Sequence, residues 1–284
     1  MFDGYGGGVM MPEERALVFL DGKVFKADSS LMRSLRPGIL KAEGAFETLR
    51  SKNFKIYALQ EHFNRLKKGL KQLNIHWIVK KEEVELLIKV LLRVSRIRSA
   101  KIRLCVWQGG GGVHTAVVIA PLNLPKRNFR LTVSRHRRTK TPLSKFKTLN
   151  YQIFYKAFRE ALDKKYDEAV LLNPSGFVVE GSRTNIFIVK DKKIFTPPLS
   201  AGCLKGVTRD FVREAALRLK IACLEKNLKI DDLLNADEVF VTNSLIGLVT
   251  VSAVDQKKFV VGSQKGIIQR LLEQYRSLIE RRLK

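Results

Sequence analysis

The chain has 284 residues, of which 45% are apolar and 28% are charged, proportions typical of a globular protein. No apolar run approaches the roughly 18 residues of a membrane-spanning helix, and the first residues lack the basic and apolar regions of a signal peptide, so we expect neither. The one unusual value is the formal net charge of +26, from 53 Lys and Arg against 27 Asp and Glu.

The excess positive charge has two interpretations. It would suit a polyanionic partner such as a nucleic acid. The basic residues, however, are spread along most of the chain, with only short runs such as 135–138 and 281–284. We therefore favour a solvated basic surface that also attracts small anions, and keep a nucleic-acid-binding protein on a degenerate enzyme scaffold as a remote alternative.

Cysteine and histidine are sparse. The three cysteines, Cys105, Cys203 and Cys223, are widely spaced without a CxxC pair, which argues against a disulfide framework or a zinc site. None of the four histidines lies at metal-ligand spacing from another histidine or a cysteine. We predict no metal site and a cytoplasmic location.

The N-terminal part alternates strand-like and helix-like segments. Its predicted strands cover residues 16–20, 23–25, 45–50, 54–58, 101–107 and 115–120. The turn signal Ser51-Lys52-Asn53 makes a hairpin of the third and fourth, and apolar residues recur at helical spacing over 63–73 and 81–97. The pattern predicts a small α+β domain with an antiparallel sheet over residues 1–120.

Two prolines and no clear periodicity make residues 121–127 the predicted interdomain linker. Beyond it, the predicted strands cover 129–134, 169–172, 177–179, 185–189, 238–241 and 247–251, and the predicted helices cover 151–164, 208–220 and 267–282. Several short strands indicate a mixed or barrel-like sheet in a larger domain over residues 128–284.

Five sequence signatures follow one another between Lys147 and Arg209. They read Lys147-Thr148-Leu149-Asn150-Tyr151, Tyr166-Asp167-Glu168-Ala169, Gly176-Phe177-Val178-Val179-Glu180-Gly181-Ser182-Arg183-Thr184-Asn185-Ile186-Phe187, Thr196-Pro197-Pro198-Leu199 and Leu204-Lys205-Gly206-Val207-Thr208-Arg209. In this order they resemble the class IV aminotransferases, pyridoxal-phosphate enzymes that include branched-chain and D-amino-acid aminotransferases and aminodeoxychorismate lyase. The resemblance implies a small α/β N-terminal domain, a larger pseudo-barrel C-terminal domain with pyridoxal 5'-phosphate between them, and a homodimer.

A pyridoxal-phosphate enzyme needs an amine to hold the cofactor aldehyde as a Schiff base and to move the substrate's α-proton. Composition does not distinguish Lys140, Lys145, Lys147 and Lys156, but the resemblance selects Lys147, at the head of a Lys-x-x-Asn pattern. It likewise places Glu180 against the pyridine nitrogen. By local chemistry alone, Glu180 would be an exposed glutamate at a strand end.

A phosphate cradle is expected where Gly206-Val207-Thr208 precedes a predicted helix, because amide groups and the Thr208 hydroxyl would point at an anion. A threonine also caps helices without binding anything. The resemblance assigns Val207, Thr208, Arg65 and Ser244 to the cofactor phosphate. Without it, Arg65 would be a polar helix residue and Ser244 a turn residue.

Substrates of the family are small amino and carboxylate compounds, which an arginine binds in bidentate fashion. Arg103 stands where relatives carry a substrate-side arginine, and the outward position of an alternating strand is the ordinary alternative. Tyr151 resembles the cofactor-bonding tyrosine of the branched-chain enzymes, which have one more residue between lysine and tyrosine. The glycines 109–112 lack a following Gly-Lys-Ser/Thr and predict a turn between strands.

The choice of family member follows mainly from the segment Phe46-Glu47-Thr48-Leu49-Arg50, which resembles aminodeoxychorismate lyases more than branched-chain aminotransferases. The segments Asn243-Ser244-Leu245 and Lys147-Thr148-Leu149-Asn150 favour the same choice. The leading hypothesis is therefore a lyase that converts 4-amino-4-deoxychorismate to 4-aminobenzoate and pyruvate, a step in folate synthesis. The alternative is an aminotransferase acting on branched-chain or D-amino acids.

Overall fold

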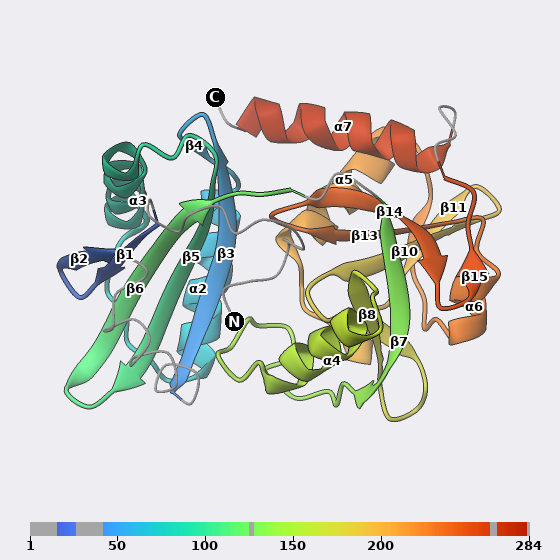
Figure 1. The fold of residues 1–284 in the computed structure, drawn as a ribbon, viewed down its shortest axis with the longest axis horizontal. Helices are drawn as coiled ribbons and strands as arrows, with labels where there is room; N and C mark the ends of the chain where they lie inside the picture. Colours follow the sequence, from blue (N-terminus) through green and yellow to red (C-terminus); the bar gives the residue numbers. More distant parts are fainter. Residues whose placement is uncertain (1–15, 27–41, 125–127, 262–265, 283–284) are drawn as a thin grey trace. The chain divides into compact units, whose positions relative to one another are not determined.

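The computed structural model describes residues 16–26, 42–124, 128–261 and 266–282, so residues 125–127 of the predicted linker lie outside the described part. No helix within the described ranges is long and apolar enough to cross a membrane. The chain divides into two compact units (Figure 1). Unit 1 comprises Met1–Leu124 and Phe146–Tyr151, and unit 2 comprises Pro125–Lys145 and Gln152–Arg282.

Unit 1 is an antiparallel sheet that carries two helices. Its six strands follow the order β2-β1-β6-β5-β3-β4, and every pairing is antiparallel, which confirms the predicted sheet. The strands are β1 (Leu17–Leu20), β2 (Lys23–Lys26), β3 (Glu43–Lys52), β4 (Lys55–Ile56), β5 (Ala100–Gly109) and β6 (Gly112–Pro121). The helices are α2 (Leu59–Gln72) and α3 (Lys81–Ser95).

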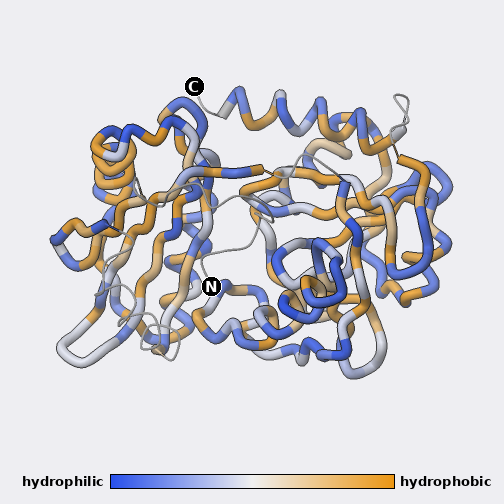
Figure 2. Tube along the Cα trace, viewed as in Figure 1, coloured by the Kyte–Doolittle hydropathy of each residue, from blue (hydrophilic) through white to orange (hydrophobic). Residues whose placement is uncertain are grey.

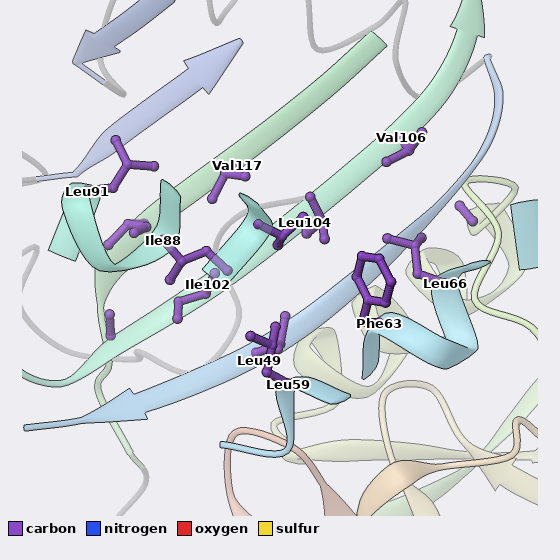
Figure 3. Packing of buried hydrophobic residues seen from close by; sticks show 14 of the residues in the cluster. Leu49, Leu59, Phe63, Leu66, Ile88, Leu91, Ile102, Leu104, Val106 and Val117 are labelled. Atoms are coloured by element: carbon purple, nitrogen blue, oxygen red, sulfur yellow. The ribbon is translucent and has the colours of Figure 1, made fainter. Parts of the chain in front are cut away.

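Alternation along the strands gives the sheet of unit 1 two distinct faces. The helix face carries the main core, in which leucine, isoleucine and phenylalanine side chains of α2 and α3 pack against β3, β5 and β6 (Figure 3). Each such buried side chain contributes about 1.5–3 kcal/mol. The opposite face carries a smaller cluster of Phe46, Cys105, Trp107 and Ala116 together with Leu149. Residues far along the chain therefore complete this second face.

The predicted strand over 54–58 is shorter than expected, because β4 covers only Lys55–Ile56. Phe54 and Ala58 both have left-handed backbone, with φ of 63° and 52°. Such residues cannot continue an extended ladder, and Ala58 is the N-cap of α2. The chain thus turns directly from the hairpin into the helix.

Unit 2 is a nine-stranded mixed sheet that curls on itself. The pairing order is β12-β11-β10-β13-β14-β7-β8-β9, with β15 paired to β14, and the β11–β12, β14–β7 and β7–β8 pairs are parallel. Although β9 ends this path and β10 lies within it, one tight turn joins them, and Gly181 N–H donates to Thr184 O over 2.7 Å. This confirms the predicted mixed, barrel-like sheet.

The elements of unit 2 alternate short strands with helices. The strands are β7 (Phe129–Arg137), β8 (Glu168–Leu172), β9 (Val178–Gly181), β10 (Asn185–Lys190), β11 (Lys193–Thr196), β12 (Cys223–Glu225), β13 (Glu238–Asn243), β14 (Gly247–Val254) and β15 (Lys257–Lys258). The helices are α4 (Gln152–Asp163), η2 (Leu199–Ala201), α5 (Val207–Arg218), α6 (Ile230–Leu234) and α7 (Ile267–Arg282). Hydrophobic and hydrophilic residues alternate along α7 with helical periodicity (Figure 2), and Ile268, Leu271 and Tyr275 are buried.

Candidate active site

Lys147 is held on the edge of β3. Phe46 N–H donates to Lys147 O over 2.8 Å, Leu149 N–H donates to Gly44 O over 2.9 Å, and the residue between them forms an antiparallel bridge to β3. These bonds fix residues 147–149 as a short added strand. Because cross-strand neighbours share a face, the Lys147 side chain lies on the face of Phe46.

Two aromatic rings surround the Lys147 amine. Its Nζ lies 4.5 Å from the ring centroid of Phe46 and 4.6 Å from that of Tyr151, and donates to Tyr151 Oη over 3.2 Å. The rings meet edge to face at 5.3 Å. Such cation–π contacts are worth about 0.5–2 kcal/mol each, so these two rings help to position the amine. Tyr151, which sequence comparison left open, therefore contacts the predicted catalytic lysine.

Arg103 lies on β5, on the same face as Lys147. Its guanidinium carbon is 4.8 Å from the centroid of the Phe46 ring. The structure thus brings Lys147 and Arg103 to one aromatic side chain. Two cations on one apolar face can attract a small carboxylate.

Gly44 allows the added strand of residues 147–149 to lie close to β3. A Cβ there would lie 2.6 Å from Trp107 Cβ and 2.8 Å from Leu149 Cδ1, and closer still to Val106 O. We expect Gly44→Ala to destabilise the protein by about 1–3 kcal/mol, the usual cost of overpacking. Thermal unfolding measures this effect, with Gly110→Ala as the control because nothing lies within 4 Å of its added methyl. Equal melting temperatures for the two variants would contradict the assignment of strain to Gly44.

Arg65 lies on α2 and is fixed by a buried carboxylate on the helix face of the sheet. Arg65 Nε donates to Glu47 Oε1 and Nη2 to Oε2, both over 2.7 Å, and His62 Nδ1 lies 2.6 Å from Glu47 Oε2. Glu47 is 1% exposed. This bidentate pair holds the guanidinium in one orientation. The phosphate role of Arg65 stays a prediction, and Glu47 and His62 are partners that the sequence did not indicate.

The charges of this cluster make stability depend on pH. Burial acts to raise the pKa of Glu47, but Arg65 and His62 outweigh it and lower that pKa from 4.5 to about 2. Burial lowers the pKa of His62 from 6.5, although Glu47 opposes the change. Since both folded values lie below the unfolded ones, the unfolded chain takes up more protons in acid. The stability that this cluster contributes is therefore present at neutral pH and is lost as the pH falls, from Glu47 mainly between 4.5 and about 2.

We expect Glu47→Gln to lower the free energy of unfolding at pH 7 by about 3–5 kcal/mol, because it removes the buried negative charge that pairs with the partly buried Arg65. The variant should also lose less stability than the wild type between pH 5 and pH 3. Urea unfolding followed by tryptophan fluorescence at each pH measures both effects. Glu85→Gln, at an ion pair on the surface of α3, is the control. Parallel pH curves for Glu47→Gln and wild type would contradict the assignment.

Glu180 is a buried acid in β9, with 3% of its surface exposed. Its Oε2 accepts Leu204 N–H over 2.9 Å, and its Oε1 lies 3.6 Å from Arg138 Nε. The Arg138 guanidinium in turn stacks on Phe154, 4.8 Å from the ring centroid. Glu180 is therefore not the exposed strand-end glutamate of the alternative interpretation. It is a buried carboxylate that accepts a backbone hydrogen bond through Oε2 and has a guanidinium near Oε1.

The start of α5 provides the geometry expected of an anion site. Gly206 is the N-cap, its backbone is extended, and no side chain caps the helix. The first-turn amides of a helix have no partner within the helix, and Thr208 is only 3% exposed. A Cβ on Gly206 would collide with Asn185 Oδ1, and Asn185 Nδ2 donates to Leu204 O over 3.0 Å. Glu180 and the α5 N-terminus are thus joined through one residue, Leu204.

Ser244 lies half-buried in the turn after β13, which the side chain of Asn243 shapes. Asn243 Oδ1 accepts from Leu245 N–H over 2.9 Å, and its Nδ2 donates to Arg183 O over 3.1 Å. Thr242, cross-strand from Asn185, is fully buried, and its hydroxyl has no hydrogen-bond partner within the described residues. Thr242 is a candidate that the sequence analysis missed, because only the family pattern distinguished one hydroxyl of Thr242-Asn243-Ser244 from the other.

These residues of unit 2 fit a phosphorylated cofactor. An uncapped helix N-terminus, the buried Thr208 and the unsatisfied Thr242 hydroxyl are all donors suited to phosphate oxygens. A buried hydroxyl without a partner costs about 1–3 kcal/mol, which such a bond would recover. Among the described residues, no group of three or more His, Cys, Asp or Glu side chains could hold a metal ion.

Residues 44–254 match the family model of class IV amino-transferases. The chain belongs to the class IV aminotransferase family. These enzymes depend on pyridoxal 5'-phosphate, so family membership confirms both the resemblance and the cofactor prediction. The α+β fold predicted for a member of this family is confirmed as well.

Three proteins illustrate its similarities. A Methanocaldococcus jannaschii protein with the provisional name of branched-chain-amino-acid aminotransferase is 34% identical over 276 residues, covering 92% of this chain and 96% of the relative. The aminodeoxychorismate lyase of Bacillus subtilis is 27% identical over 268 residues, covering 88% of this chain and 90% of the lyase. The crystal structure of a Thermoproteus uzoniensis branched-chain aminotransferase with norvaline superposes with a TM-score of 0.83 at 28% identity, covering 93% of this chain and 94% of that enzyme.

Proposed function

We propose that this class IV enzyme is an aminotransferase acting on branched-chain amino acids. The observation that carries the proposal is its 34% identity, over 92% of its length, to a relative named for that activity. The similarity to the Thermoproteus enzyme supports the same choice. The alternative stated from the sequence is thereby favoured over the lyase.

Bound pyridoxal phosphate supplies an aldehyde that takes up an amino group and a ring that withdraws electrons from the substrate's α-carbon. Lys147 would hold the aldehyde, and its released Nζ would then accept the α-proton. Tyr151 and Phe46 contact Nζ and would help to hold the released amine near this position. The lysine therefore acts as a general base whose position is set before substrate binds.

The remaining site residues would bind the cofactor and the substrate and orient them. Glu180 would hold a proton on the pyridine nitrogen, and the α5 amide groups with Thr208 and Ser244 would bind the phosphate, as would Arg65. Arg103 is the candidate for the substrate carboxylate, which leaves Phe46 and Trp107 on the same face to contact an aliphatic side chain. An apolar surface next to a cation suits a branched-chain amino acid.

The lyase is the second candidate. It is favoured by the Bacillus subtilis relative and by the Phe46-Glu47-Thr48-Leu49-Arg50 segment. Both reactions would use the same lysine, so the residues described so far do not separate them. Their products do, because only the lyase releases 4-aminobenzoate.

The test supplies purified, cofactor-loaded protein with leucine, isoleucine or valine and 2-oxoglutarate, and measures glutamate together with the branched 2-oxo acid. A parallel reaction with 4-amino-4-deoxychorismate measures 4-aminobenzoate and pyruvate. Glutamate formation with branched-chain donors, without release of 4-aminobenzoate in the parallel reaction, supports the proposal. Release of 4-aminobenzoate without transamination overturns it in favour of the lyase. Light scattering of the same sample tests the predicted homodimer.

A further inference from the structure

Glu168 is a second buried acid of unit 2, and none of the roles above uses it. It begins β8 and is fully buried. Its Oε1 accepts from Ala169 N–H over 2.8 Å, from Ser182 N–H over 3.0 Å and from the Ser182 hydroxyl. Its Oε2 accepts from Arg183 N–H and from Thr184 Oγ1, both over 3.1 Å. All these donors are amides or hydroxyls, and both carboxyl oxygens act as acceptors.

The donors belong mostly to the turn of residues 181–184, which joins β9 to β10. Ser182 N–H also donates to Ala169 O over 2.9 Å, so the turn is bound to β8 through its backbone as well. A Cβ on Gly181 would lie 3.1 Å from Glu168 Cδ and would collide with Thr184 Oγ1. The carboxylate therefore packs directly against the turn and determines its shape.

Three candidate cofactor contacts depend on this turn. Glu180 immediately precedes it. Asn185 immediately follows it and binds Leu204 O, while Leu204 N–H binds Glu180. The carbonyl of Arg183, within the turn, accepts from Asn243, which shapes the turn containing Ser244. A shift of residues 181–184 would thus move the acid, the residue that abuts Gly206 and the Ser244 turn together.

We propose that Glu168 is a positioning residue for the cofactor. It holds the 181–184 turn so that Glu180, the α5 N-terminus and the Ser244 turn keep the places from which they bind pyridoxal phosphate. This role rests on the proposed function, since it presumes that these groups face the cofactor. A carboxylate is required because both oxygens accept, whereas a glutamine would direct an NH₂ group at one set of amide donors.

The experiment compares wild type, Glu168→Gln and Glu160→Gln. Glu160 is a matched control, because its carboxylate also accepts from a hydroxyl, that of Ser134, and from an amide, that of Arg135, in the same unit. Each protein is titrated with pyridoxal phosphate, the bound cofactor's visible absorbance is followed against pH, and the cofactor-free protein is melted. We expect Glu168→Gln to bind the cofactor at least tenfold more weakly and to move the pH midpoint of the absorbance band, with Glu160→Gln unchanged in both.

The readouts separate positioning from general stability. A Glu168→Gln protein that melts earlier but keeps the wild-type affinity and pH midpoint overturns the proposal while leaving the function intact. A wild type that takes up no cofactor overturns the proposed function and this role with it. If Glu168→Gln does not fold, Ser182→Ala tests the proposal instead, through its cofactor affinity and the pH midpoint of its absorbance band. It removes one donor, keeps the carboxylate, and should show a smaller shift in the same direction, whereas wild-type values would overturn the proposal.

Discussion

Replacing Lys147 by alanine is expected to reduce kcat for amino-group transfer by roughly 10⁴-fold or more, since it removes both the covalent anchor and the general base. The fold should survive, because the bonds of Lys147 O and Leu149 N–H to β3 involve only the backbone. The variant should also lose the visible absorbance of the lysine-bound cofactor. Single-turnover measurements of amino acid consumption and an absorbance spectrum test the two effects.

Lys156→Ala is the control for this prediction. Lys156 is an exposed lysine of α4 that composition alone did not distinguish from Lys147. Wild-type activity for Lys156→Ala beside an inactive Lys147→Ala would tie the loss to one amine. A Lys147→Ala protein with more than a small fraction of wild-type kcat would remove Lys147 from its proposed role.

Glu180→Gln is expected to lower kcat by about 10²–10³-fold, the usual effect of removing one preorganised electrostatic contact in an active site. The substitution keeps the shape of the side chain, and its amide oxygen can still accept Leu204 N–H. What it removes is the negative charge that would keep the pyridine nitrogen protonated. Cofactor affinity should therefore change much less than kcat.

Steady-state kinetics together with a cofactor titration measure this split between turnover and binding. Glu214→Gln is a suitable control, because Glu214 pairs with Arg218 one turn away on α5. An equal fall in cofactor affinity and in kcat would point to a structural role for Glu180 instead. An unchanged kcat would exclude any role of the Glu180 carboxylate in the reaction.

Local patterns predicted most elements because each pattern has a local cause. The apolar runs of β5 and β6 and the helical periodicity of α2, α3 and α7 follow directly from which side chains are buried. β11 was not predicted because its hairpin lacks such a signal. It is joined to the predicted β10 by Asp191 and Lys192, both with positive φ, where an Asn-Gly pair would ordinarily mark the turn.

The residues of the candidate site likewise fall into those that a local motif predicted and those that it did not. Lys147, Glu180 and Thr208 lie within contiguous motifs, so a resemblance could select them. Glu47, the partner of Arg65, and the buried hydroxyl of Thr242 are defined by pairings between distant segments, which no local pattern records. The choice of the lyase over the aminotransferase depended on short segments, chiefly five residues of β3. Similarity over nearly the whole chain favours the other member of the family.

The added strand of residues 147–149 affects the order in which the protein can be built. Synthesis runs from the N-terminus, and the sheet of unit 1 can form once residue 124 has left the ribosome. The Phe46 amide and the Gly44 carbonyl, however, meet their partners only after β7 has also emerged. Until then this stretch of β3 lacks these two backbone partners, and strand edges with unpaired backbone groups recruit strands from other chains. Lys147, the proposed Schiff-base lysine, is therefore also a residue whose backbone pairs with that edge.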